Sequence, residues 1–230
     1  MKIRMIIIML CWSSGLIWAQ QSIQPGNIIN DYIPRVKIYA ALFCGQAVTP
    51  YNLRYENHPY YETKSYLPGT LSYNQVVYAN VLMRFDLYRN ELSVYHPDRM
   101  YEIVLDKEKF NYAIVNGSTI ILSDDGNRSK GKFLVVLHSG AYPVVRKYRV
   151  LISEKNIDQT VRRYFDTKNQ YEVYVNGIPR PVRNKKTVIN LFPDRKRELN
   201  DFAKQQKLDF KGQLEHSIIA LVSYYESLKK

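Results

Sequence analysis

Residues 76–96 constrain the fold of this chain more than any other stretch. From 81 to 87, apolar and polar side chains alternate, which is the period of a β-strand with one buried face. The run is broken at 89–91, where Asn90 tolerates the left-handed backbone of a tight turn. The alternation then resumes over 92–95. The sequence therefore predicts a β-hairpin at the centre of the fold.

Arg84 and Asp86 share the face of this hairpin that lies opposite its apolar residues. No histidine, second acid or glycine loop accompanies them in the local sequence. We therefore expect an ion pair on a solvated sheet surface, where such a pair contributes little to stability.

Short apolar stretches at regular spacing follow the hairpin. Asn116-Gly117 separates two of them, and Asn-Gly between alternating apolar residues is a strong hairpin signal. The expected strands cover 101–105, 110–115, 118–122, 132–138 and 143–153. No helical period intervenes, so we predict an α+β protein that is mainly β. Its antiparallel β-meander would form a barrel, a roll or a sandwich, followed by two or three C-terminal helices.

Helical periodicity begins late in the chain. Asn184 is expected to cap a short helix that ends near Phe192, and Pro193 suits the start of a second helix reaching about Gln206. A wider apolar stripe over 214–228 predicts a further helix. These helices need an apolar surface to cover, and the sheet is the nearest one.

The first residues indicate export. Lys2 and Arg4 precede a short apolar run over 5–12, and Ala19 ends the segment, as in a secretory signal peptide. The run is too short to span a bilayer, and no later segment reaches the roughly 20 apolar residues that a span needs. We therefore expect a mature chain without a transmembrane span, in the periplasm or at the cell surface.

Four regions follow from these signals. Residues 1–19 form the signal peptide, and 20–68 form a lead-in with a tyrosine-rich loop. The antiparallel β domain covers 69–183, and a helical segment packed on it covers 184–230. Within the β domain, residues 158–166 are interpreted as a short connector.

Tyrosine is the unusual residue, with 20 copies against 8 Phe and 2 Trp. Residues 50–68, here called the tyrosine loop, are rich in it. Such rings either form a platform for a carbohydrate or a base, or fix the loop onto the sheet. The candidate ligand contacts are Tyr51, Tyr55, Tyr60, Tyr61 and Tyr66.

The sequence shows no recognisable catalytic arrangement. The four histidines, His58, His96, His138 and His216, have no second ligand at a metal-binding spacing. Residues 124–127 lack the glutamate of a calcium loop and predict a turn. Cys44 has apolar neighbours and is expected to be a small buried side chain. We predict no catalytic residue, no metal, no cofactor and no enzymatic activity.

Positive charge gathers in the C-terminal part. Removal of Lys2 and Arg4 with the signal peptide lowers the Lys and Arg count from 33 to 31, against 21 Asp and Glu, which leaves a net charge of +10. A basic surface attracts anionic glycans or lipid head groups, whereas export disfavours nucleic acid as a partner. The alternative is an ordinary solvated surface. The candidate polyanion contacts are Arg180, Arg183, Lys185, Lys186, Arg195 and Arg197.

Three stretches carry a resemblance to a known group. They are YEVYVNGIPRPVRNKKTVINLFPDRKRELNDFAKQQKLDF, SIIALVSYYESL and VVYANVLMRFDLYRNELSVYH. Their sequences resemble those of uncharacterised exported β-rich proteins common in the Bacteroidetes. The resemblance implies a tyrosine-rich meander, a hairpin, a lysine-rich short helix and a terminal helical pair ending in a double tyrosine, here Tyr224-Tyr225. It implies no activity.

These observations favour an exported, non-enzymatic protein that binds or scaffolds a component of the cell envelope, such as an envelope protein or an anionic glycan or lipid. Two alternatives stay open. One is a carrier that holds a small apolar ligand inside a β-barrel. The other is a hydrolase of envelope polysaccharide or peptide.

Overall fold

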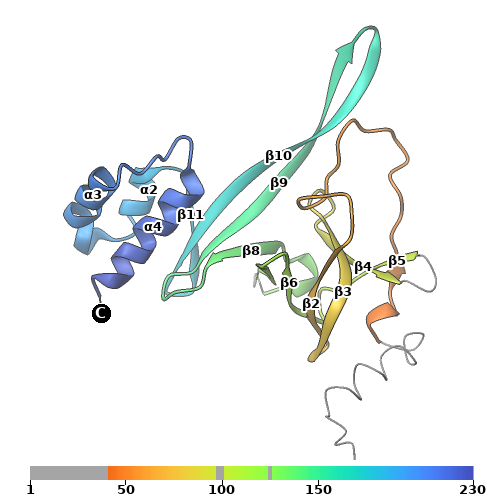
Figure 1. Ribbon diagram of the computed structural model, residues 1–230, viewed down its shortest axis with the longest axis horizontal. Coiled ribbons are helices and arrows are strands. Elements are labelled where there is room, and N and C mark those ends of the chain that lie inside the picture. The colour runs from red at the N-terminus through yellow and green to blue at the C-terminus, as the bar shows by residue number, and fades with distance from the viewer. Residues whose placement is uncertain (1–40, 97–100, 124–125, 230) are drawn as a thin grey trace, which may run out of the picture. The chain divides into compact units, whose positions relative to one another are not determined.

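The computed structural model describes residues 41–96, 101–123 and 126–229 (Figure 1). The predicted signal peptide and the lead-in up to residue 40 lie outside these residues, as do 124 and 125 of the predicted turn. Eleven antiparallel strands form one sheet in the order β1-β5-β4-β3-β2-β6-β7-β8-β9-β10-β11. The mainly β architecture with C-terminal helices is confirmed.

The strand bounds are β1 (Gln46–Ala47), β2 (Leu67–Tyr73), β3 (Val76–Asp86), β4 (Glu91–His96), β5 (Tyr101–Val104), β6 (Phe110–Val115), β7 (Ser118–Leu122), β8 (Phe133–His138), β9 (Val144–Ile157), β10 (Thr160–Val175) and β11 (Ile178–Val182). The helices are α2 (Lys185–Ile189), α3 (Lys196–Gln205) and α4 (Leu214–Ser227). Single 3-10 turns lie at η1 (Ala41–Phe43), η2 (Arg128–Lys130) and η3 (Pro193–Arg195). No helix in these described ranges is long and apolar enough to cross a bilayer.

The central hairpin is β3 and β4, as the sequence predicts. Asn90 in its turn has a φ of 55°, and the alternate residues of β3 from Val81 are buried. The sheet curls so that the rings of Phe85 on β3 and Phe133 on β8 lie 5.4 Å apart, although three strands separate them in the sheet order. The sheet does not close, so the barrel alternative is wrong.

The longest hairpin corrects the sequence interpretation. Residues 158–166 are not a connector: β9 continues to Ile157, the chain turns at Asp158-Gln159 with φ values of 50° and 62°, and β10 begins at Thr160. Fourteen residue pairs join the two strands. Charged residues lie on both faces of the distal part, because it has no core to cover, and this hides the alternation by which a strand is recognised.

The helices cover the base of this hairpin, beside β11 (Figure 1). The Asn184 side chain accepts the Thr187 N–H at 3.0 Å, while the Thr187 hydroxyl accepts the Asn184 N–H at 3.1 Å. This reciprocal cap explains why the chain leaves the sheet there. The shared apolar core contains Val144, Val173, Val182, Val188, Phe192, Leu199, Ile218, Leu221 and Tyr225. The contacts between α4 and the sheet include Arg146–Glu215 at 2.8 Å and His138–Glu226 at 2.9 Å.

Two prolines protect the outer edge of β11. Pro179 and Pro181 lie at alternate positions of a strand that pairs with β10 through Ile178, Arg180 and Val182. The prolines therefore hold the outward backbone positions, where they offer no N–H to a further strand.

The prediction for Cys44 is wrong. Its side chain is exposed, next to the short edge strand β1, whose two residues are also exposed. Its apolar sequence neighbours did not indicate this, because Leu42 alone turns fully into the core.

Replacing Leu221 by alanine tests the helical core. Leu221 is 0% exposed, so Leu221→Ala should lower the free energy of unfolding by about 2–5 kcal/mol in urea titrations. Leu53, which is 47% exposed, is the matched control, and Leu53→Ala should change it by no more than about 0.5 kcal/mol. Equal effects of the two substitutions would contradict the assigned core.

Candidate anion-binding site

The tyrosine loop is fixed onto the sheet through its own rings. The Tyr51 hydroxyl donates to Asp86 Oδ2 at 2.7 Å, and the Tyr55 ring stacks on Phe165 with centroids 4.3 Å apart. Tyr61 is buried, and its hydroxyl bonds Ser118 at 3.0 Å. Of the two interpretations of this loop, the contacts favour attachment to the sheet over an open stacking platform.

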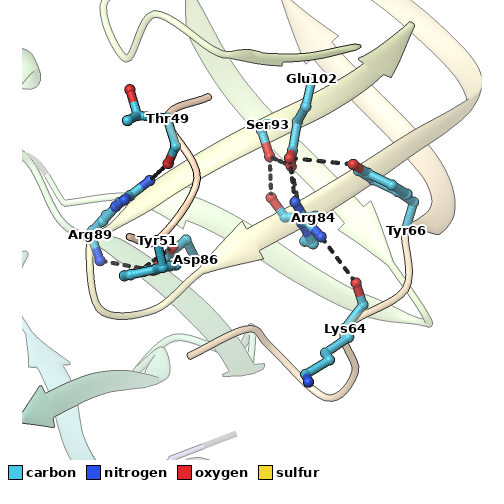
Figure 2. A network of polar contacts seen from close by, with 9 residues as sticks. All are labelled: Thr49, Tyr51, Lys64, Tyr66, Arg84, Asp86, Arg89, Ser93 and Glu102. Carbon is cyan, nitrogen blue, oxygen red and sulfur yellow. Dashed lines mark hydrogen bonds and ion pairs between the residues drawn. The ribbon is translucent and has the colours of Figure 1, made fainter. Parts of the chain in front are cut away.

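Arg84 organises the rest of this contact (Figure 2). Its Nε donates to Glu102 at 3.0 Å, and a second nitrogen pairs with the other carboxylate oxygen. The guanidinium lies between two rings of the loop, 4.2 Å from the centroid of Tyr60 and 4.7 Å from that of Tyr66. The Tyr66 hydroxyl also donates to Glu102, at 3.3 Å. Arginine between two aromatic faces is a favourable cation–π arrangement.

The solvated Arg84–Asp86 pair expected from the sequence is therefore wrong. Asp86 is 6% exposed and accepts the Tyr51 hydroxyl and the backbone N–H groups of residues 88 and 89, whereas Arg84 pairs with Glu102. Donors of the same chain therefore occupy carboxylate oxygens of both Asp86 and Glu102. This network holds the loop in place.

Burial also raises the pKa values of tyrosines in the tyrosine loop. Burial, together with the hydrogen bond to Asp86, raises the pKa of Tyr51 well above its ordinary value. Burial likewise raises the pKa values of Tyr60, Tyr61 and Tyr66. Because tyrosine is already protonated at neutral pH, these shifts extend the protonated range of the four hydroxyls to higher pH.

A different part of the chain forms an open, charged pocket. It has a volume of about 530 Å³ and lies where β9, β10 and the end of β11 meet. This basic pocket is lined by, among others, Lys147, Arg149, Lys168, Glu172 and Arg183. Glu172 is its single acid and pairs with Lys147.

Three cations of the basic pocket are not held in ion pairs by other described residues. Arg149, Lys168 and Arg183 are exposed, and none forms an ion pair with another described residue. Arg149 and Lys168 are direct cross-strand partners, so their side chains leave the same face of the sheet about 5 Å apart. Like charges at opposite positions are unfavourable for a sheet. The fold therefore holds a local excess of positive charge here.

The backbone of β10 adds donors at this place. Phe165 turns its N–H and its carbonyl away from β9, to the side chain of Asn57, at 2.7 and 2.9 Å. Strand alternation directs the N–H groups of Thr167 and Asn169 to the same edge. Pairing with β11 starts only at Tyr171, so β11 does not cover these two groups, and Asn169 lines the basic pocket.

Cations gathered on one concave surface, with backbone N–H donors at its edge, are the chemistry that binds carboxylate, sulfate or phosphate oxygens. The distribution of charge along the chain agrees with this. Residues 1–127 carry 11 basic and 11 acidic residues, whereas 128–230 carry 22 and 10.

The six predicted polyanion contacts do not gather in one place. Arg180 lies on β11, Lys185 and Lys186 on α2, Arg195 on η3, and Arg197 on α3. Arg195 bonds Glu198 at 3.1 Å. Only Arg183 of the six lines the basic pocket.

Sequence reasoning missed Lys168 and did not single out Arg149. The signal was the pair of residues at the hairpin turn: counting outward from Asp158-Gln159 places residue 149 opposite 168. Unless that turn is recognised, the sequence does not indicate that Arg149 and Lys168 are cross-strand partners.

The histidines remain dispersed in the described ranges, which contain no group of three or more His, Cys, Asp or Glu side chains arranged to hold a metal ion. Comparisons with protein-family models, curated proteins and solved structures found no match for this chain.

The raised pKa of Tyr51 predicts a pH dependence. In the unfolded chain, tyrosine loses its proton near about pH 10, whereas the folded protein keeps it to a higher pH. The unfolded state then binds fewer protons, so the free energy of unfolding should fall as the pH rises above about 10.

Tyr51→Phe should cost about 0.5–1.5 kcal/mol at pH 7, because it removes a hydrogen bond to Asp86, and should make the alkaline fall shallower. Urea unfolding at a series of pH values measures both effects. An unchanged slope in the variant would show that Tyr51 is not the titrating group.

Proposed function

We propose that this chain is an exported, non-enzymatic binding protein of the cell envelope, and that the basic pocket binds its anionic partner. The observation that carries the proposal is the cross-strand pair Arg149 and Lys168, joined by Arg183, none of which forms an ion pair with another described residue. The sequence of residues 1–19 supports export.

The opposite face of the same hairpin shows that this arrangement is not a general property of its strands. There, Arg163 and Glu154 are direct partners, and their side chains form an ion pair at 2.7 Å. At this pair one face neutralises its charges, whereas Arg149 and Lys168 on the other face form no ion pair. A concave site with a surplus of cations attracts anions over several ångströms and holds them in contact.

Other features favour binding over the two alternatives. The described strands enclose no barrel interior of the kind that a carrier of apolar ligands needs. The single acid of the basic pocket, Glu172, is already paired with Lys147, so no two carboxylates face each other there as a glycosidase requires.

Neutralising the basic pocket tests the proposal. The triple variant Arg149→Gln, Lys168→Gln and Arg183→Gln should weaken binding to polygalacturonate by about threefold to a hundredfold, because each exposed charge contact contributes about 0.2–1 kcal/mol. Titration calorimetry at low salt measures the loss, and wild-type affinity should fall steeply as salt is added.

The matched control is Arg180→Gln, Lys186→Gln and Arg197→Gln. It removes the same charge from three exposed positions outside the basic pocket. If the two triple variants lose affinity equally, net charge and not this site is responsible. Binding by wild-type protein that is absent or insensitive to salt would contradict the proposal.

A further inference from the structure

A second pair of cations lies further along the same hairpin. Lys155 and Arg162 are direct cross-strand partners, and neither forms an ion pair with another described residue. Residues 149 and 155 are six positions apart, so both pairs project from one face of the sheet. The Lys155 ammonium lies 5.1 Å from the ring centroid of Tyr164, which holds this charge on that face.

This face is open in the described structure, whereas the other is covered around Phe165. On the other face, Phe165 is covered by the rings of Tyr51 and Tyr55. On the open face, Leu151 between the two cation pairs is 47% exposed. The open surface thus carries one uncompensated cation pair at the basic pocket and another near the hairpin tip.

The spacing of the pairs determines what can contact both. Six residues of strand measure about 20 Å at ~3.4 Å per residue. A single carboxylate or phosphate group cannot bridge that distance. A ligand that uses both pairs must be an extended chain with anionic groups along it.

The residues between the two cation pairs determine which extended anionic polymers can bind. Ser153 and Tyr164 face each other there, and Leu151 lies opposite Asp166. The Asp166 carboxylate repels a polymer as densely charged as polyphosphate, but it accepts hydrogen bonds from sugar hydroxyls. Leu151 offers apolar contact to a sugar ring.

We propose that the ligand is a linear acidic glycan, with neutral units between its acidic ones, that extends from the basic pocket to Lys155 and Arg162. This inference rests on the proposed function, because the basic pocket supplies one of the two contact points. Tethering at two points should make affinity depend on chain length.

Hyaluronan oligosaccharides, in which acidic and neutral sugars alternate, are the probes. NMR titration, which follows millimolar affinities, compares a tetrasaccharide with a dodecasaccharide. Lys155→Gln with Arg162→Gln should weaken binding of the dodecasaccharide by about tenfold and leave binding of the tetrasaccharide unchanged. The control, Lys196→Gln with Lys204→Gln, removes two exposed charges from α3 and should change neither. Amide spectra verify that each variant is folded.

The outcomes separate the two proposals. Suppose that Lys155→Gln with Arg162→Gln leaves dodecasaccharide binding intact while the triple variant of the basic pocket abolishes it. The contact of the glycan with Lys155 and Arg162 is then wrong, and the proposed function stands. If wild-type protein binds neither oligosaccharide nor polygalacturonate, both are wrong. Binding of polyphosphate as tight as that of the dodecasaccharide would overturn the assignment of a glycan.

Discussion

The register of β9 against β10 is the constraint on which the rest of this structure depends. Fourteen pairs run from Val144–Val173 at the base to Ile157–Thr160 at the turn. Because strand side chains alternate between faces, a shift by one residue would exchange the two faces along the whole hairpin. It would turn Val173 away from the helices and separate Arg149 from Lys168. One register therefore sets both the helical core and the charged face.

The site results from where neighbouring segments end. Asn57 occupies the β10 edge at Phe165, and β11 occupies it from Tyr171 onward. The reciprocal cap of Asn184 and Thr187 makes the chain leave the sheet soon after Val182 and begin α2. The interval between these two coverings exposes the backbone donors beside Arg183. A longer β11 would fill the interval with its own strand.

Much of the fold could be predicted from the sequence, because its signals are local. The β3–β4 hairpin, the turn at Asn116-Gly117 and the cap at Asn184 each depend on residues close together in the chain. The apolar stripe of α4 could likewise be predicted from its helical periodicity. These features need only periodicity and turn chemistry.

What could not be predicted depends on partners distant in sequence. Arg84 finds Glu102 and two rings of the tyrosine loop, so its apparent exposure was misleading. The cations of the basic pocket come from β9, β10 and the residue after β11, and their grouping follows from a register that charged residues conceal. The concentration of positive charge in the C-terminal part could be predicted, but the cross-strand pairing of Arg149 with Lys168 could not.

The substitution Lys168→Glu tests the central claim, that the cation pair is kept for binding and at a cost to the sheet. It turns the unfavourable pair with Arg149 into an oppositely charged one. The account predicts that the free energy of unfolding rises by about 0.2–1 kcal/mol while polygalacturonate binding is lost. A variant that is no more stable and binds as tightly as the wild type would contradict it.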